Sequence, residues 1–256
     1  MSRHIEYVSP AGLRNDGRRP IEHRRVEVEF GVAPMCDGSC MYTCGTTKIL
    51  AMVQGPREPT TMRGAVFAAP DEAIISCTVA LSAYSNEKSR RNPQRRSKQC
   101  NELSSVVLSV LNSVVIKAQY PGSQIHLQLE VLQHDGSEKA ACINASVMAL
   151  VHASVALRDI AVAATVGFIA NVPLIDLTNF EVKSVCPVVV LVARAHATTM
   201  VTYMEMDMRL SEVVLDNLVV AAQQAIERLF EDMILPAVRK QIHDGMELEK
   251  VDVRGE

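Results

Sequence analysis

Alternation of apolar and polar residues marks the first third of this 256-residue chain. Val26, Val28 and Phe30 alternate with charged neighbours, which is the pattern of a strand with one solvated face. The segments Asp37-Gly38-Ser39 and Cys44-Gly45-Thr46 have the composition of turns and predict an antiparallel meander. Strands are therefore expected at residues 26–30, 48–53, 65–69 and 74–84.

Helical periodicity then takes over. Apolar residues at 103–115 recur at intervals of three and four, which predicts an amphipathic helix that ends at Tyr120-Pro121-Gly122. Residues 140–157 are apolar nearly all round, which predicts a buried helix with Ser137 as its N-cap. A last long helix is expected after Ser211. Further strands are predicted at 125–131, 162–168, 174–177, 185–192 and 198–206.

The order of these elements is strands, helix, strand, helix, strands, helix, which indicates a mixed α/β fold of the α+β type. The pattern forms two halves that meet near Arg158-Asp159 without a low-complexity linker. We expect an N-terminal arm at residues 1–19, a first half at 20–157, a second half at 158–245 and a tail at 246–256.

Composition excludes collagen, a disordered tail and a disulfide miniprotein, because 48% of the residues are hydrophobic. The net charge of -3 at first argues against a polyanionic partner. However, residues 1–100 carry 15 basic and 10 acidic side chains, whereas the other 156 residues carry 11 and 19. The first part therefore has a net charge of +5 and the second of -8, so the basic part needs its own explanation.

The seven cysteines are odd in number and irregularly spaced, which favours reduced thiols in an intracellular protein. Residues 1–16 mix charged and polar side chains and predict no signal peptide. Polar residues such as Asn144, His152 and Arg158 interrupt the most apolar region, so no membrane span is expected.

Two clusters suggest chemistry but fail on geometry. If Cys36, Cys40 and Cys44 lay on one strand, each would be ~13 Å from the next. That is too far for ligands that must each lie ~2.3 Å from one zinc ion, so we expect no metal and no cofactor. His134, Asp135 and Ser137 include the residue types of a hydrolytic triad. Because sequence neighbours rarely have triad geometry, we expect a loop there instead.

A run of basic residues precedes the helix at 103–115. Glu87 is the last acidic residue before this run, and the run itself contains none. Its members are Lys88, Arg90, Arg91, Arg95, Arg96 and Lys98. One interpretation is a solvated loop. The other is docking of a phosphate backbone, because cations beside the positive end of a helix are unfavourable unless an anion binds there. Arg57 and Arg63, and the group Arg14, Arg18 and Arg19, would extend such a track. With only 4% aromatic residues, binding of such a backbone would be sequence-tolerant and salt-sensitive.

Seven motifs, in this order along nearly the whole chain, resemble the ribonuclease PH family and, within it, ring subunits of the RNA exosome. The motifs are Arg14-Asn15-Asp16-Gly17-Arg18-Arg19-Pro20, Asp37-Gly38-Ser39, Gly45-Thr46-Thr47-Lys48, Gly55-Pro56-Arg57-Glu58, Leu132-Gln133-His134-Asp135-Gly136, Leu157-Arg158-Asp159-Ile160 and Ile175-Asp176-Leu177.

The resemblance implies the ribonuclease PH fold, with two βα halves packed as one compact unit, and a six-membered ring of related subunits threaded by RNA. Active members use inorganic phosphate to release nucleoside diphosphates from the 3′ end. Their site needs an arginine near the start of the helix after the basic run, a Gly-Ser-Arg or Gly-Thr-Arg loop, and paired aspartates for acid catalysis or a metal.

Carried over residue by residue, this site shows departures. Ser137 is kept, but Glu138 stands at the arginine position of the loop. Asp176 is kept, but Val182 stands at the position of the second aspartate. The arginine near the helix start aligns with Gln99. Because a carboxylate repels phosphate at short range, we expect a lost phosphorolytic site, no catalytic residues and no enzyme activity.

The expected function is a non-catalytic ring subunit of the RNA exosome, a scaffold and RNA-channel wall for rRNA maturation and for turnover of mRNA and non-coding RNA. The expected RNA contacts are Arg57, Arg63, Arg95, Arg96 and Lys98. Expected partners are other ribonuclease PH-like ring subunits, cap subunits, an associated nuclease and single-stranded RNA, with no membrane. Expected locations are the nucleus, nucleolus and cytoplasm. The alternative is an active phosphate-dependent 3′-to-5′ exoribonuclease like the archaeal ring subunit.

Overall fold

Two β-sheets organise the protein. The computed structural model describes residues 7–9, 12–58, 72–85, 93–169, 171–184 and 186–252. The first sheet has the order β1 (Val26–Phe30), β2 (Gly38–Cys44), β3 (Thr47–Arg57), β5 (Gln124–Gln133) and β4 (Ile74–Leu81). Its neighbours are antiparallel except for the parallel pair β4 and β5. The second, antiparallel sheet has the order β7 (Val172–Ile175), β6 (Ala161–Ile169), β8 (Val188–Arg194) and β9 (Ala197–Met206).

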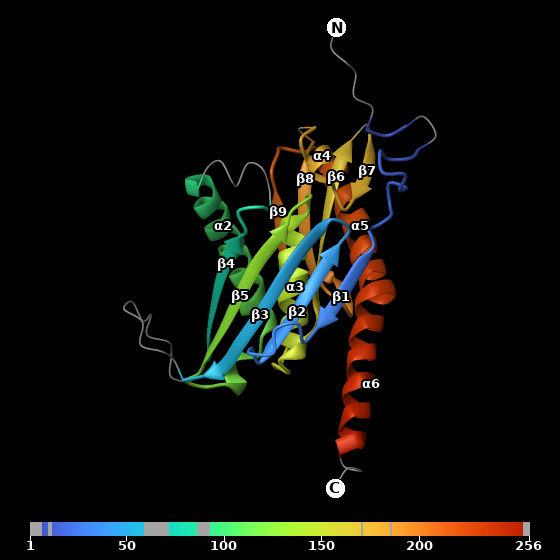
Figure 1. The fold of residues 1–256 in the computed structure, drawn as a ribbon. Helices are drawn as coiled ribbons and strands as arrows, with labels where there is room; N and C mark the ends of the chain where they lie inside the picture. Colours follow the sequence, from blue (N-terminus) through green and yellow to red (C-terminus); the bar gives the residue numbers. More distant parts are fainter. Residues whose placement is uncertain are drawn as a thin grey trace.

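Helices cover the sheets and fill the space between them (Figure 1). They are α2 (Pro93–Val114), the short η1 (Lys117–Gln119), α3 (Glu138–His152), α4 (Asn179–Val182), α5 (Glu212–Leu229), the π-helical η2 (Phe230–Ile234) and α6 (Leu235–Asp252). α3 contacts β2 and β3 of one sheet and β6 of the other, α2 packs on β4, and α5 packs on the second sheet. This mixed α/β arrangement confirms the predicted fold class.

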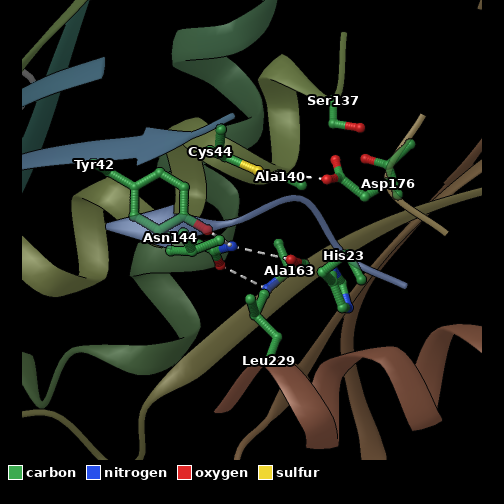
Figure 2. Close-up of a pocket in the computed structure, with 13 residues that line it drawn as sticks. His23, Tyr42, Cys44, Ser137, Ala140, Asn144, Ala163, Asp176 and Leu229 are labelled. Atoms are coloured by element: carbon green, nitrogen blue, oxygen red, sulfur yellow. Dashed lines mark hydrogen bonds between the residues drawn. The ribbon is translucent and has the colours of Figure 1, made fainter. Parts of the chain in front are cut away.

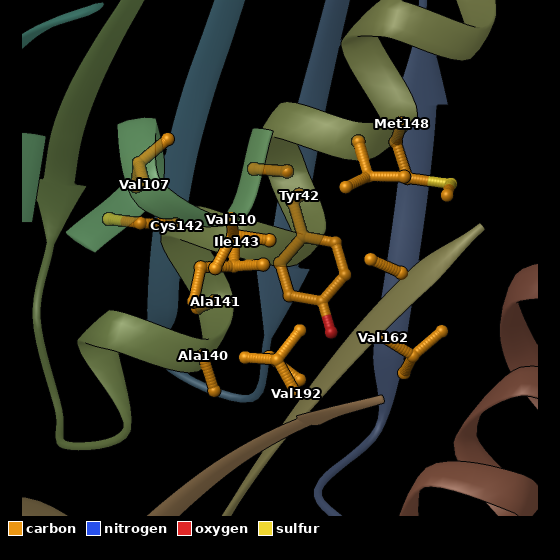
Figure 3. Close-up of a cluster of buried hydrophobic side chains, with 14 of the residues drawn as sticks. Tyr42, Val107, Val110, Ala140, Ala141, Cys142, Ile143, Met148, Val162 and Val192 are labelled. Carbon is orange, nitrogen blue, oxygen red and sulfur yellow. The ribbon is translucent and has the colours of Figure 1, made fainter. Parts of the chain in front are cut away.

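α3 is buried on all sides because it lies between the two sheets. Figure 3 shows Ile143 and Met148 of α3 close to Tyr42 of the first sheet and Val162 of the second. These side chains belong to one continuous hydrophobic cluster that includes residues of both sheets. Removing this helix surface from water therefore stabilises both sheets at once.

Two predicted helices end earlier than the sequence indicated. α2 ends at Val114, before Tyr120-Pro121-Gly122, and α3 ends at His152 rather than at 157. The reason is a pairing between the segments that follow them. Val115 and Leu157 form an antiparallel bridge, so both segments leave the helical conformation to exchange backbone hydrogen bonds.

The predicted turn at Asp37-Gly38-Ser39 is wrong, because β2 begins at Gly38. A Cβ atom at Gly38 would lie 2.6 Å from the carbonyl oxygen of Ala149 and 2.5 Å from Cβ of Ala153. This glycine therefore permits close packing of β2 on α3 instead of forming a turn. The turn predicted at Gly45-Thr46 is confirmed.

Several other expectations have different outcomes. The strand expected at 65–69 lies outside the described residues, and β4 ends at Leu81 rather than at 84. The predicted division near residue 158 stays a prediction, although the strands of the first sheet precede this point and those of the second follow it.

All seven cysteines are free thiols. In the described part of the chain, no helix is both long and apolar enough to cross a membrane.

Candidate functional site

Two helices begin at the same edge of the first sheet. Because β4 and β5 run parallel, the helices that follow them, α2 and α3, both start beyond the carboxyl ends of these strands (Figure 1). A surface cavity of about 330 Å³ lies between their first turns. It is lined by Lys98, Gln99, Glu102, Leu103, Glu138 and Lys139. The positive end of the α3 dipole adds to the cationic side chains here.

The structure brings together the two positions that the family resemblance assigned to phosphate binding. Nε2 of Gln99 donates a hydrogen bond to Oε1 of Glu138 over 2.6 Å. The other carboxylate oxygen of Glu138 lies 3.1 Å from Nδ1 of His134. Gln99 and Glu138 are therefore neighbours at the cavity, and His134 faces the second oxygen of the Glu138 carboxylate.

Lys139 is the second cation of this cavity, and the sequence analysis did not single it out. Its Nζ lies 2.9 Å from a carboxylate oxygen of Glu102 and 2.8 Å from one of Glu205 on β9. Partial burial alone would lower the pKa of Lys139, but the hydrogen bonds to Glu205 and Glu102 outweigh it and raise the pKa above its ordinary value. Lys139 therefore stays cationic and joins α2, α3 and β9.

Ser137 does not cap α3 with its side chain, which corrects the prediction. It has a left-handed backbone conformation with φ of 51°, and its hydroxyl donates to the carbonyl oxygen of Leu177 over 3.0 Å. At neighbouring Gly136, a Cβ atom would lie 2.4 Å from the same carbonyl oxygen. The loop before α3 is thus held against the segment that follows β7.

His134, Asp135 and Ser137 do not form a triad, as expected. His134 faces Glu138, Asp135 accepts a hydrogen bond from the Thr46 hydroxyl over 2.6 Å, and Ser137 bonds to a backbone carbonyl. Their side chains have three different partners, so the three residues lack the relay that nucleophilic catalysis requires.

Asp176 lies outside this cavity and lines a separate small pocket of about 20 Å³ together with Tyr42, Cys44 and His23 (Figure 2). Arg24 binds both of its carboxylate oxygens, with Nε at 2.8 Å and Nη2 at 2.7 Å. Burial would raise the pKa of Asp176, but the hydrogen bonds and charge of Arg24 outweigh it and hold the pKa well below its ordinary value. Asp176 is therefore an anion at neutral pH, in a buried ion pair.

A second buried ion pair lies next to Val182. Arg14, only 3% exposed, binds the carboxylate of Glu181, and its Nε donates to Oε1 over 2.8 Å. Arg14 is therefore not part of an RNA track, because it has no access to solvent. Arg18 pairs with Asp16 at 2.6 Å. The roles of Arg24 and Glu181 are not visible in the sequence, because their partners are more than 150 residues away.

The predicted RNA-binding residues fall into separate groups. Arg96 and Lys98 lie in the first turns of α2, which begins at Pro93, so the basic run continues into the helix instead of stopping before it. Arg57 ends β3 and pairs with Asp37 at 3.1 Å. Arg57 lies beside the start of β5, whereas α2 begins near the end of β5. Because a strand rises ~3.3 Å per residue, Arg57 is ~30 Å from Arg96 and Lys98.

The remaining members of the predicted track cannot be placed. Arg63 and three members of the basic run, Lys88, Arg90 and Arg91, lie outside the described residues, as does the side chain of Arg95. The RNA-binding assignment of Arg57, Arg63, Arg95, Arg96 and Lys98 stays a prediction.

Comparisons with known proteins agree with this fold and identify the family. The model of the "3' exoribonuclease family, domain 1" matches residues 22–156. The Arabidopsis thaliana exosome complex component RRP41 homolog is 38% identical over 177 residues, covering 69% of this chain and 72% of the relative. The human exosome complex component RRP41 is 33% identical over 239 residues, covering 92% and 96%. The chain belongs to the ribonuclease PH family, in its exosome RRP41 branch.

The fold is also that of solved exosome structures. An Archaeoglobus fulgidus exosome with RNA bound to the active site aligns with a TM-score of 0.74 and 21% identity, over 87% of this chain and 93% of that chain. Rice Rrp46 aligns with a TM-score of 0.73 and 23% identity, over 87% and 100%.

The prediction that the chain is not an enzyme is wrong. Its family is a 3′ exoribonuclease family, and its relatives include the exosome complex component Rrp41 of the archaeon Pyrobaculum arsenaticum, 34% identical over 170 residues. That prediction rested on Glu138 and Gln99 at the two arginine positions and on Val182 at the position of the second aspartate. In the structure, Lys98 and Lys139 line the same cavity, and Glu138 is bound by Gln99. These three departures therefore do not establish a lost site.

Proposed function

We propose that this protein is a ring subunit of an RNA exosome that forms part of the RNA-channel wall and guides 3′ ends during 3′-to-5′ processing and degradation. Its RNAs would include rRNA precursors, mRNA and non-coding RNA. Its partners would be related ring subunits, cap subunits and an attached nuclease, and its locations the nucleus, nucleolus and cytoplasm. Membership in the exosome RRP41 branch supports this assignment.

One observation carries the RNA contact. The first turn of α2 contains no acidic residue, and its basic residues continue through Arg96 to the exposed Lys98. Lys98 also lines the cavity at the start of α3. Cations at the positive end of a helix are unfavourable without an anion, so this arrangement favours a phosphate group as the ligand.

The direct test is RNA binding by a double variant, Arg96→Ala with Lys98→Ala. Fluorescence anisotropy with a single-stranded RNA should give weaker binding and a salt slope reduced by about 1.4, because each lost contact to a single strand removes about 0.7. A matched control, Arg25→Ala with Arg209→Ala, removes the same charge from exposed positions elsewhere. If both variants change the salt slope equally, RNA binding depends on the net charge of the protein and not on contacts to Arg96 and Lys98.

A second candidate function is phosphate-dependent exoribonuclease activity of this chain. The cavity supports it, because Lys98 and Lys139 offer two cations to phosphate groups beside the start of α3. RNA and inorganic phosphate incubated with the assembled ring would release nucleoside diphosphates, and Lys98→Ala would reduce that release about tenfold or more. A ring that binds RNA but releases no diphosphate contradicts this candidate and leaves the channel-wall role intact.

A further inference from the structure

A turn that follows β4 presents an exposed aromatic side chain at the edge of the first sheet where the cavity lies. Tyr84, in this turn, is 75% exposed. In the described part of the chain, the only other exposed aromatic side chain is Phe180, whose ring lies 5.4 Å from that of Tyr7 between centroids. No described ring stacks on Tyr84. Because its ring stays in water, Tyr84 adds little hydrophobic stabilisation to the fold and is accessible to a ligand.

Hydrogen bonds at both ends hold this turn on β5 and the residue after it. The amide of Ser85 closes the turn by donating to the carbonyl oxygen of Ser82 over 3.0 Å. The amide of Ser82 donates to the carbonyl oxygen of Val131 over 3.1 Å, and the carbonyl oxygen of Ser85 accepts from the amide of His134 over 3.3 Å. These bonds fix the backbone at Tyr84, so a contact to its ring costs little conformational entropy.

The same contacts place Tyr84 beside the cavity. His134, which bonds to the turn, also faces Glu138, with 3.1 Å between Nδ1 and the nearer carboxylate oxygen. Glu138 lines the cavity together with Lys98 and Lys139. His134 therefore connects the turn with the cavity wall, and the exposed ring and the two ammonium groups lie at the same edge of the sheet.

An aromatic ring beside cations matches the two chemical parts of a nucleotide. The phosphate group is an anion that the ammonium groups of Lys98 and Lys139 can bind. The base has a flat π-face on which an aromatic ring can stack. Proteins that bind single strands combine these two contacts. An inorganic anion, in contrast, would use the cations alone and would have no use for the ring.

We propose that Tyr84 stacks on a base of bound RNA, next to a phosphate group held at Lys98 and Lys139. This inference rests on the proposed RNA-binding function and adds a contact to a base, which the cations do not provide. Stacking tolerates any base, because every base has a π-face. A single stacking residue therefore strengthens binding without making it specific for one sequence.

The test compares RNA with a strand of the same length that carries no bases. Fluorescence anisotropy measures the affinity of the full chain for a 12-nucleotide single-stranded RNA and for 12 stable abasic ribonucleotides. Tyr84→Leu should weaken binding of the RNA about fivefold or more, the loss expected for one stacked base, and leave binding of the abasic strand unchanged. Equal weakening for both strands, or no weakening for either, overturns the proposal.

Two further variants assign the effect to the ring. Tyr84→Phe keeps the ring and should bind RNA within about twofold of the wild type, whereas a loss as large as that of Tyr84→Leu would implicate the hydroxyl group and contradict stacking. Phe30→Leu is the matched control, because the Phe30 ring stacks on His152 at the other end of α3, with 5.8 Å between the ring centroids. It should leave RNA affinity unchanged, and a loss equal to that of Tyr84→Leu would overturn the proposal.

The outcomes also separate this inference from the proposed function. RNA affinity that Tyr84→Leu does not change contradicts stacking but leaves the RNA-binding role intact. Absence of RNA binding by the wild type contradicts both. If Tyr84→Leu weakens assembly with other ring subunits while RNA affinity stays the same, Tyr84 contacts a protein and the proposal fails.

Discussion

Buried ion pairs at single residues fix the segments around the candidate site. Arg24 holds Asp176, and Arg14 holds Glu181, with all four side chains nearly inaccessible to solvent. Breaking such a pair leaves an uncompensated buried charge, which is far more costly than losing an exposed pair. The retained aspartate of the family motif therefore has a structural role in this chain that its sequence position did not reveal.

Replacing Asp176 with Asn should lower the free energy of unfolding by about 3–5 kcal/mol, because Arg24 would remain charged and buried. Urea unfolding monitored by circular dichroism measures this change. The control, Glu27→Gln, breaks the exposed pair with Arg25 and should change the free energy by less than about 1 kcal/mol. Similar effects of the two substitutions would refute the structural role of Asp176.

The same pair predicts a pH dependence of stability. The pKa of Asp176 is lower in the folded protein than in the unfolded chain, where it is ~3.9. The contribution of Asp176 to the free energy of unfolding is therefore complete above pH ~4 and is lost as the pH falls toward its folded-state pKa. Unfolding midpoints between pH 6 and pH 3 should decline less steeply in Asp176→Asn than in the wild type. Parallel declines would contradict this assignment.

At the scale of elements, periodicity predicted the type of most strands and of the long helices, but it did not identify β2 and did not show where some elements end. The alternation of Val26, Val28 and Phe30 identified β1 because one face of that strand is solvated. The ends of α2 and α3 depend on the bridge between Val115 and Leu157, which no local pattern encodes. α4 was missed because four residues are too few for a helical period.

The site was predictable to a similar extent. The motif resemblance singled out Gln99 and Glu138 separately, and the structure joins them by a hydrogen bond. Their correspondence to the phosphate-binding arginines of the family stays a prediction. Lys139 was not recognised, because its importance comes from Glu205 on a distant strand. Charge assigned position by position from the sequence therefore gave the wrong conclusion about activity, since the cavity combines charges from three elements.

The packing of β2 on α3 provides a test at the element scale. Gly38→Ala should destabilise the protein by about 1–3 kcal/mol, because its Cβ would collide with the backbone of α3 at Ala149. Differential scanning calorimetry measures the change in unfolding temperature. Gly122→Ala is a useful comparison, since no atom lies within 4 Å of its added Cβ and only backbone strain at φ of 63° remains. A Gly38→Ala variant as stable as the wild type would contradict the proposed contact.

At the scale of the whole molecule, one core joins both sheets, and the proposed RNA-binding cations that the structure describes lie at two distant places. Arg57 is beside the start of β5, and Arg96 is near its end. An RNA strand that contacts both places must extend over ~30 Å.

This spacing predicts that the effect of Arg57 depends on RNA length. Arg57→Ala should weaken binding of a 12-nucleotide single strand in anisotropy measurements but leave binding of a trinucleotide unchanged, because three nucleotides cannot reach both places. Arg96→Ala should weaken both. If Arg57→Ala affects the two RNAs equally, the two groups of cations do not belong to one extended path.

Assembly into an exosome ring is the property on which the proposed function depends. Native mass spectrometry of the chain expressed alone and together with other ribonuclease PH-like exosome ring subunits measures this assembly. Co-expression should give a six-subunit ring that contains this chain and retains single-stranded RNA. A chain that stays unassociated beside folded, mutually assembled neighbours would contradict it.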